Sequence, residues 1–225
     1  MSLYSIALAT FLIGTSQQFG LSSTVSLTDP PYEDDPRNFE HQHATGFLCS
    51  NSTYYMVNRT YTPNVTSECI SVNVTSGLRN GTYQALLRHR FNGSSIISSM
   101  NITVLPFTSE PHTEDNALLF NISMKPNVIV KARTATEGVG SLYAESGFDL
   151  VPPPPVYKFM YINSNKTCAV LRATHQQNGT GCELFSAGVG GAPHLVPQEC
   201  MDVYKQNCPN TTSEVWKNDC KEGGH

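Results

Sequence analysis

Apolar and polar residues alternate along much of the chain from about residue 54 onwards. Successive side chains of a β-strand point to opposite faces, so this period of two predicts half-buried strands. The runs recur about every ten residues, which is typical of a β-sandwich or an up-and-down barrel. They occupy residues 54–60, 70–75, 83–91, 96–105, 117–122, 128–132, 156–162, 168–173 and 182–185.

Turn-forming residues separate these runs. Asn92-Gly93 predicts a tight hairpin between the runs at 83–91 and 96–105. Residues 178–181 (Asn-Gly-Thr-Gly) join the last two runs. Residues 137–155 are rich in glycine and end in four prolines, which cannot donate to a strand ladder, so we expect a loop there.

One segment shows the spacing of a helix instead. Pro197 can open a helix, and Cys200, Tyr204 and Cys208 then recur every four residues on one face. Because that face carries two cysteines, we expect disulfides to hold it against the outside of the sheet.

The N-terminal part differs from the rest of the chain. Residues 3–14 are apolar and uncharged, a length that suits a signal peptide and is too short to span a bilayer. We therefore expect a signal peptide at 1–16; the alternative is a buried strand or helix. Residues 17–50 form an acidic, proline-containing lead, expected to be an ordered loop or a flexible arm. The main domain then spans residues 51–225.

Composition also indicates export. Charged residues make up only 14% of the chain, and the net charge of −4 argues against nucleic acid or anionic membranes as partners. Asn-x-Ser/Thr sequons are far more numerous than the roughly three or four expected by chance, so we predict N-glycosylation of a secreted protein. The sequons begin at Asn51, Asn58, Asn64, Asn73, Asn80, Asn92, Asn101, Asn121, Asn165, Asn178 and Asn210.

The chain has seven cysteines, which in an exported protein are first of all disulfide partners. Zinc is the alternative, but there is no Cys-x2-Cys pair, and the spacing from Cys200 to Cys208 is not a usual ligand spacing. His41 and His43 are better explained as a solvated pair in the lead. We expect no metal and no cofactor.

Motifs of catalysis are not found in the sequence. There is no Gly-x-Ser-x-Gly, no His-Glu-x-x-His and no dinucleotide-binding glycine pattern. Cys49 and His89 could be proposed as a nucleophile and its base, but an odd cysteine in a secreted chain is more often unpaired or intermolecular. We therefore expect a protein that is not an enzyme.

The most specific pattern lies in the second half of the chain. Residues 168–170 (Cys-Ala-Val) are followed after twelve residues by 183–185 (Glu-Leu-Phe) and after fourteen more by Cys200. This pattern resembles the signature of the tick salivary lipocalins, the family of the histamine-binding proteins: Cys-Asp-aliphatic, Glu-Leu-aromatic and Cys. The resemblance covers most of residues 50–220, through a first strand at 54–61, last strands at 163–172 and 178–185, and a closing helix and tail at 196–220.

The resemblance implies a fold and a way of working. It implies an all-β, eight-stranded antiparallel up-and-down lipocalin barrel with a C-terminal helix packed outside. Together with the helix face, it suggests three disulfides that leave Cys49 unpaired. The expected pairs are Cys168–Cys200, Cys182–Cys208 and Cys69–Cys220. It implies no enzymatic activity. It implies instead that the protein sequesters a small host mediator to blunt inflammation and haemostasis. That mediator would be an amine or a lipid such as an eicosanoid or fatty acid.

This chain departs from that signature at one position. Ala169 stands where the amine binders carry Asp, so a buried ammonium would have to find its carboxylate elsewhere. Glu183 is the candidate, with a solvent-facing strand position as the alternative, and Phe185 can stack but not donate a hydrogen bond. We expect Tyr55, Arg59 and Val170 to line the ligand site.

One further expectation concerns charge inside the barrel. Arg59, Arg88 and Arg172 lie in alternating runs. If one of them points inward it would pair naturally with a lipid carboxylate, while at least two are expected to face outward. A one-residue slip in register would reverse any such assignment.

Two classes of function stay open: a scavenger of a small molecule, amine or lipid, and a protein-binding immunomodulator that uses the barrel surface. Heavy glycosylation weakly disfavours the second, because glycans shield surface. We expect a secreted monomer in either case.

Overall fold

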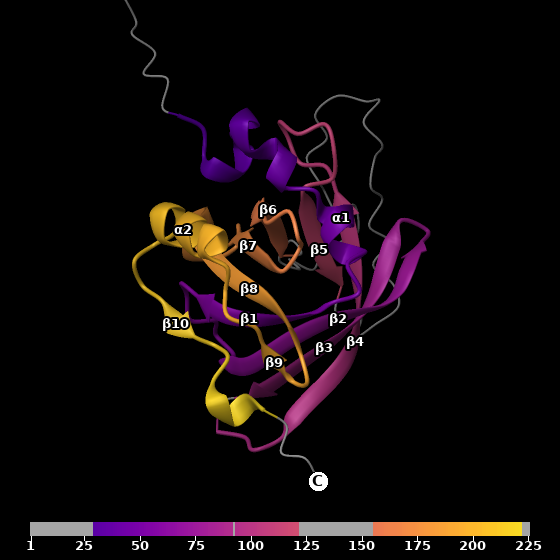
Figure 1. The fold of residues 1–225 in the computed structure, drawn as a ribbon, viewed down its shortest axis with the longest axis vertical. Helices are drawn as coiled ribbons and strands as arrows, with labels where there is room; N and C mark the ends of the chain where they lie inside the picture. Colours follow the sequence, from indigo (N-terminus) through magenta and orange to yellow (C-terminus); the bar gives the residue numbers. More distant parts are fainter. Residues whose placement is uncertain (1–28, 92, 122–154, 222–225) are drawn as a thin grey trace, which may run out of the picture.

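The computed structural model describes residues 29–91, 93–121 and 155–221, without the side chains of Leu78 and Asn121. Eight antiparallel strands follow one another around a barrel, and the pairing of β1 with β8 closes it (Figure 1). The expected eight-stranded up-and-down barrel with an external helix is therefore confirmed. The barrel strands are β1 Thr53–Arg59, β2 Ser67–Arg79, β3 Thr82–Phe91, β4 Ile97–Phe107, β5 Ala117–Asn121, β6 Val156–Ile162, β7 Cys168–Ala173 and β8 Gly181–Val189.

Shorter elements complete the fold. Two-residue strands flank the barrel, β9 (Ala192–Pro193) against β8 and β10 (Ser213–Glu214) against β1. The helices are η1 Tyr32–Asp34, η2 Pro36–His41, α1 Ala44–Leu48, η3 Gln177–Gly179, α2 Gln198–Asn207 and η4 Asn218–Cys220. Of the helices described, none is long and apolar enough to cross a membrane.

Strand β7 shows how alternation builds two apolar layers. All six of its residues are buried. Ala169 and Leu171 belong to the cluster inside the barrel, whereas Cys168 and Val170 belong to a second cluster beneath α2. Because both faces are covered, the strand contains almost no polar side chains.

Bulges in β1 and β6 change which residues face inward. The register of β1 against β8 shifts between Met56 and Asn58, and that of β6 against β7 shifts between Phe159 and Tyr161. An extra residue in one strand reverses the alternation beyond it. Even-numbered residues of β1 therefore point inward before the bulge, and Arg59 does so after it.

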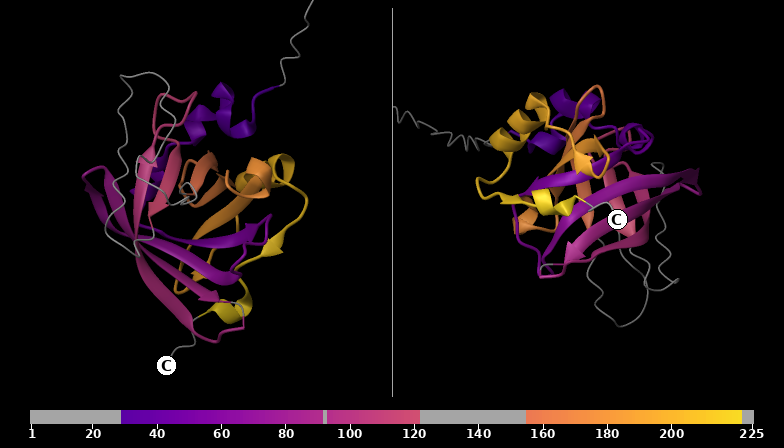
Figure 2. Two further views of the ribbon diagram at one scale, coloured as in Figure 1. Left: turned by 180° about the vertical axis from the view of Figure 1, so that it is seen from behind. Right: turned by 60° about the horizontal axis from the view of Figure 1, so that its bottom comes forward.

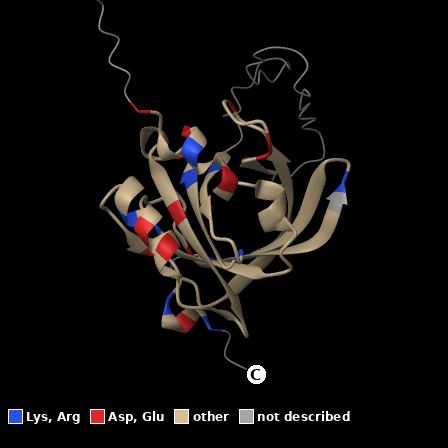
Figure 3. Cartoon of the chain, turned by 45° about the horizontal axis from the view of Figure 1, so that its top comes forward, with Lys and Arg blue, Asp and Glu red and all other residues tan. Residues whose placement is uncertain are grey.

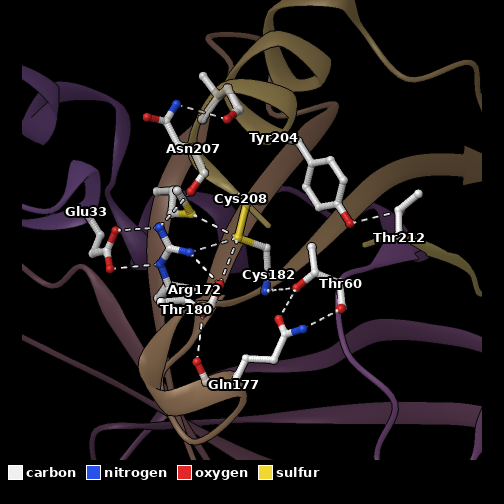
Figure 4. Close-up of a disulfide and its surroundings, with 12 residues drawn as sticks. Glu33, Thr60, Arg172, Gln177, Thr180, Cys182, Tyr204, Asn207, Cys208 and Thr212 are labelled. Carbon is white, nitrogen blue, oxygen red and sulfur yellow. Dashed lines mark hydrogen bonds and ion pairs between the residues drawn. A yellow bond between two sulfur atoms is a disulfide. The ribbon is translucent and has the colours of Figure 1, made fainter. Parts of the chain in front are cut away.

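Helix α2 packs on the outside of the barrel (Figure 1). Two disulfides attach it there, and Figure 4 shows the one between Cys182 and Cys208. The three bridges are those expected: Cys168–Cys200, Cys182–Cys208 and Cys69–Cys220. Cys49 is free and exposed. The predicted helix face is also confirmed, since Cys200 and Tyr204 are its buried residues.

The lead corrects our expectation of a loop or flexible arm. Residues 32–48 form three short helices at one end of the barrel (Figure 2). Ala44, Phe47 and Leu48 of α1 belong to the interior cluster, and the Phe47 ring stacks on Tyr54 at 3.9 Å. The helices of this segment could not be predicted from its composition, because its acidic residues contact the barrel instead of facing water.

Those contacts are ion pairs and a buried amide. Glu33 pairs with Arg172 of β7, and Asp34 pairs with Lys158 of β6 at 2.8 Å. Acidic and basic residues accordingly lie close together where the lead covers the barrel (Figure 3). Gln42 is 1% exposed and donates to the Met160 carbonyl, at the bulge of β6, at 3.0 Å.

Gln42→Met should lower the free energy of unfolding by about 1–3 kcal/mol, because the buried Met160 carbonyl would lose its donor. The His112 ring, 2.6 Å from the Gln42 side-chain oxygen, would lose a partner as well. Urea denaturation measures the change. The exposed neighbouring substitution Glu40→Met is the control, and equal effects of the two would contradict the role given to Gln42.

Several predictions concern residues outside those described. These are the signal peptide at 1–16, the strand at 128–132, and nearly all of the loop at 137–155. Seven sequon asparagines are exposed and Asn58 and Asn73 are partly exposed, while the side chains of Asn92 and Asn121 are not described. Glycosylation stays a prediction.

Candidate ligand-binding site

Glu183 provides a carboxylate inside the barrel, near the start of β8. Its side chain is on the same face as Phe185 and Ala187, and only 4% of the residue is exposed. Tyr54, which stacks on the lead, pairs with Ala187, whereas Arg59 pairs with Glu183. Glu183 and Arg59 therefore lie toward the end of the barrel opposite α1.

Two neighbours interact with this carboxylate. The Tyr61 hydroxyl donates a hydrogen bond to Glu183 Oε1, and the Arg59 guanidinium lies 5.9 Å from the centre of the Tyr61 ring. Burial raises the pKa of Glu183 to about 7, although the Tyr61 hydrogen bond and the Arg59 charge both act to lower it. Near neutral pH this carboxyl is therefore divided between its charged and neutral forms.

Aromatic side chains extend the polar cluster. Tyr157 of β6 contacts Phe120 edge-on at 5.0 Å and His175 at the same centroid distance. Burial, together with the nearby Glu183 charge, raises the pKa of Tyr157 and of Tyr61, so both stay neutral hydrogen-bonding groups. These rings can contact a flat or elongated ligand, and their hydroxyls can hydrogen-bond to it.

Two buried side-chain atoms on β1 and β3 lack partners. Arg59 Nε and His89 Nε2 are enclosed, with no hydrogen-bond partner among the described residues. Arg59 is 6% exposed and His89 is 7% exposed. Burial lowers the pKa of both groups. Unpaired buried polar atoms are rare in folded proteins and call for an explanation.

The rest of the interior is apolar. It is built from aromatic and aliphatic side chains of all eight strands together with α1. The fully or nearly fully buried members on the strands include Met56, Tyr83, Ala85, Ile102, Val104, Leu118, Phe159, Ile162, Ala169, Leu171, Phe185 and Ala187. The barrel thus offers apolar surface along most of its length and polar groups at one end.

Only part of the expected site comes together. Glu183, Phe185 and Arg59 face the interior, and the solvent-facing alternative for Glu183 is ruled out by its burial. Tyr55 is on the outer face, where its ring packs edge-on against Trp216 at 4.6 Å, and Val170 lies beneath α2. We therefore leave these two residues out of the candidate site.

We expected at least two of Arg59, Arg88 and Arg172 to face outward. This is confirmed, since only Arg59 of the three points inward. Arg172 is buried on the outer side, where it pairs with Glu33. Arg88 lines a small outer hollow beside Trp216.

Sequence analysis did not place Tyr61, Tyr157 or His89 in the ligand site, although it named His89 as a possible catalytic base. Tyr61 lies just beyond the predicted first run, and its inward orientation depends on the β1 bulge. His89 carried a usable signal: it alternates with Leu87 and Ala85, which are interior residues, and a histidine at such a position is unusual.

Two hollows among the described residues lie outside the barrel. One, of about 130 Å³, lies between η2 and residues 112–116. The other, of about 10 Å³, is the one beside Trp216. Neither is lined by Glu183 or Arg59.

A closed up-and-down barrel with an outer helix and a few polar groups in an apolar interior defines a lipocalin-type binding protein. A family model described as tick histamine binding protein matches residues 32–222. The chain belongs to this family. It is therefore a salivary lipocalin of the kind that binds small ligands.

Similarity to individual proteins is low. A search of curated proteins found no match. Among solved structures, AM182 in complex with serotonin is 12% identical with a TM-score of 0.45, over 78% of this chain and 91% of that one. Japanin from Rhipicephalus appendiculatus, bound to cholesterol, is 13% identical with a TM-score of 0.42, over 73% of this chain and 91% of that one. Likeness at this level does not identify the ligand of this chain.

Proposed function

We propose that this chain is a secreted salivary lipocalin that sequesters a small host mediator, a biogenic amine or a lipid, and carries out no catalysis. The observation that carries the proposal is the enclosed polar cluster of Glu183, Tyr61 and Arg59 at one end of an apolar barrel. Such an interior suits a ligand with an apolar body and one polar end. The three disulfides fit an extracellular protein.

The polar cluster does not serve stability, because apolar side chains in its place would stabilise the fold more. Burying a carboxyl and a guanidinium disfavours folding unless both are well paired. Glu183 accepts a hydrogen bond from Tyr61, and Arg59 Nε has no partner among the described residues. A ligand group that pairs with them would offset that unfavourable burial, which supports a binding role.

The direct test is to identify what the protein holds. Protein secreted from insect cells would be analysed by native mass spectrometry and solvent extraction, then titrated with histamine, serotonin and long-chain fatty acids. We expect a single equivalent of at least one of these to bind. Failure of every small molecule, with the barrel folded by circular dichroism, would contradict the proposal.

Histamine and serotonin should bind about ten- to a hundredfold more weakly than they would to a barrel with Asp at position 169. Ala169 is fully buried inside the barrel and pairs with Phe185, so an Asp introduced there would face the interior near Glu183. Isothermal titration of Ala169→Asp should show the gain. Nanomolar histamine binding by the unchanged chain would contradict this prediction.

One observation favours a second candidate function. Two hollows among the described residues lie outside the barrel, which suits a protein-binding immunomodulator that uses the barrel surface. That function predicts that Glu183→Gln leaves activity in an inflammation assay unchanged. The scavenger function predicts that the same substitution alters both ligand affinity and activity.

A further inference from the structure

Strands β1 and β2 separate part of the way along the barrel. Residues 53–55 of β1 pair with residues 71–73 of β2, a register that would bring Val57 opposite Cys69 if it continued. Val215 of the C-terminal tail lies between them instead. Its amide donates to the Val57 carbonyl and its carbonyl accepts from the Cys69 amide, both at 2.9 Å. The tail is therefore part of the barrel wall at this level.

Both strands are irregular where they separate. The register of β1 against β8 shifts between Met56 and Asn58, and that of β2 against β3 shifts between Glu68 and Ser71. Cys69 lies within the second shift and has a φ of 55°, a left-handed conformation that is unfavourable for a residue with a Cβ. Because the two strands bulge at one level, they leave room for a third segment between them, which the tail occupies.

The tail segment at residues 213–216, here called the wall segment, contributes to both faces of the wall. Val215 is 1% exposed and belongs to the interior cluster, whereas the Trp216 ring packs against Tyr55 on the outer face. The side chain of Val215 thus closes the apolar interior from a part of the chain that follows the eight strands and α2.

The wall segment is fixed more firmly at its ends than in its middle. The disulfides of Cys208 and Cys220 attach the chain to the barrel before and after it. Between them, Val215 is the only buried residue of 209–219. A hollow of about 10 Å³, roughly room for one water molecule, lies beside Trp216 and Cys220. A segment with one buried side chain is of the kind that opens locally while the rest of the protein stays folded.

The wall segment borders the polar cluster of the interior. Arg59 is directly opposite Ser213 on one side and opposite Glu183 on the other. If the wall segment moved away, β1 and β2 would face each other across two strand spacings, about 10 Å at about 4.8 Å each. That opening would be one strand wide and would lead to the interior beside Arg59.

We propose that the wall segment is a movable part of the barrel, and that its displacement opens a lateral passage for small molecules to the interior beside Arg59. The two disulfides keep the displaced segment attached, so that it returns to the same place. The inference goes beyond the proposed function, since it concerns the route into the barrel and is tested without any ligand. Its failure would therefore leave the binding role untouched.

Opening is measured by amide hydrogen exchange, followed by NMR on the full chain. The amides of Val215 and Cys69 donate the hydrogen bonds that opening breaks. We expect both to exchange at least about tenfold faster than the amides of β7, which open only with the whole barrel. Exchange of both at the rate of β7 would overturn the proposal, because the wall segment would then open only on global unfolding.

An engineered disulfide can hold the wall segment closed. Asn58 and Glu214 are directly opposite on β1 and β10, and neither is buried. The Cα separation of such a pair, about 4.5–5.5 Å, suits a disulfide. Asn58→Cys with Glu214→Cys, made with Cys49→Ser to remove the free thiol, should slow exchange of the Val215 amide at least about tenfold more than that of β7. Asn58→Ser with Glu214→Ser in the same background is the matched control.

Passage of a small molecule is measured with a thiol placed inside the barrel. Ile102 is 3% exposed in the interior cluster, on β4, which β3 separates from β2. Ile102→Cys would be labelled with methyl methanethiosulfonate, in the variant with the mapped 58–214 disulfide and in the serine control. We expect labelling to be about tenfold slower with the disulfide. Equal rates would overturn the passage, because the reagent would then enter at an end of the barrel. Slowing no greater than that of β7 exchange would also overturn it, by assigning labelling to global unfolding.

A variant without a new disulfide tests the opposite change. Val215→Ala removes part of the apolar side chain that holds the wall segment in place, so it should speed both thiol labelling and exchange of the Cys69 amide about tenfold. Exchange of the β7 amides, measured in the same samples, shows how much of this change is global. If labelling and exchange rose no more than the β7 amides do, the wall segment would be a fixed part of the barrel and the proposal would be wrong.

Discussion

Replacing Glu33 by glutamine should lower the free energy of unfolding by about 3–5 kcal/mol, the loss expected when one partner of a buried ion pair is removed. Both side chains of the Glu33–Arg172 pair are 8% exposed. The Arg172 guanidinium meets the Glu33 carboxylate through Nε at 2.9 Å and through its second terminal nitrogen at 3.2 Å (Figure 4). Without that carboxylate, a buried cation would remain with neutral acceptors only.

The neutral acceptors of Arg172 explain why its position is so constrained. It donates to the carbonyls of Thr180 at 2.7 Å and Asn207 at 3.1 Å. One side chain therefore connects the lead, the turn before β8 and the end of α2. Loss of the ion pair should loosen all three, which hydrogen exchange at η1 and α2 would report.

A double substitution separates charge from packing. Glu33→Leu combined with Arg172→Met removes both charges and should recover most of the lost stability, because an apolar pair of similar volume often matches a buried ion pair. Guanidinium denaturation of the single and double variants gives the values. A Glu33→Gln variant as stable as the parent would show that the lead contributes little to the fold.

The strands and the outer helix could be predicted because they depend on repeated local signals, whereas the closed eight-stranded barrel was implied by the family resemblance. Period-two alternation marks each strand, and the four-residue spacing of Cys200, Tyr204 and Cys208 marks α2. These patterns are properties of many residues at once, so one irregular position does not erase them. The disulfides came from the helix face together with the family pattern.

The inward or outward direction of single residues could not be predicted across a bulge. Strict alternation places Tyr55 and Arg59 on one face, yet the extra residue after Met56 puts Tyr55 outside and Arg59 inside. A bulge leaves no consistent mark on composition, because its effect is a change of pairing between two distant strands. The prediction that Val170 lines the ligand site was wrong for another reason. Helix α2 covers the outer face of β7, so this face is as apolar as the inner one.

The lead could not be predicted because its order depends on partners far away in the chain. Glu33, Asp34 and Gln42 look solvated in the sequence, and each has its partner more than a hundred residues later. Composition alone therefore favoured a loop, whereas tertiary contacts stabilise helices too short to be stable alone.

The buried carboxyl of Glu183 should make stability depend on pH between about 4.5 and 7. Its pKa is raised from 4.5 to about 7 in the fold, so the folded state keeps a proton that the unfolded state has lost. The contribution of Glu183 to stability is fully present below about pH 4.5 and is lost as the pH rises to about 7. The loss amounts to about 3 kcal/mol, because each pH unit between the unfolded and folded pKa values corresponds to about 1.4 kcal/mol.

Glu183→Gln cannot ionise and should not show this loss. We expect the difference in free energy of unfolding, variant minus parent, to be about 3 kcal/mol more positive at pH 8 than at pH 4. Urea denaturation at both pH values measures it, and using the difference between variants cancels the other titrating groups.

Glu68→Gln is a control of opposite sign. Hydrogen bonds from Lys217 and Arg90 lower the pKa of Glu68, so its stabilising contribution is present at neutral pH and lost in acid. The difference for Glu68→Gln should therefore become more negative as the pH rises. If Glu183→Gln followed Glu68→Gln instead, Glu183 would be well paired inside the barrel, and no ligand group would be needed to accompany it.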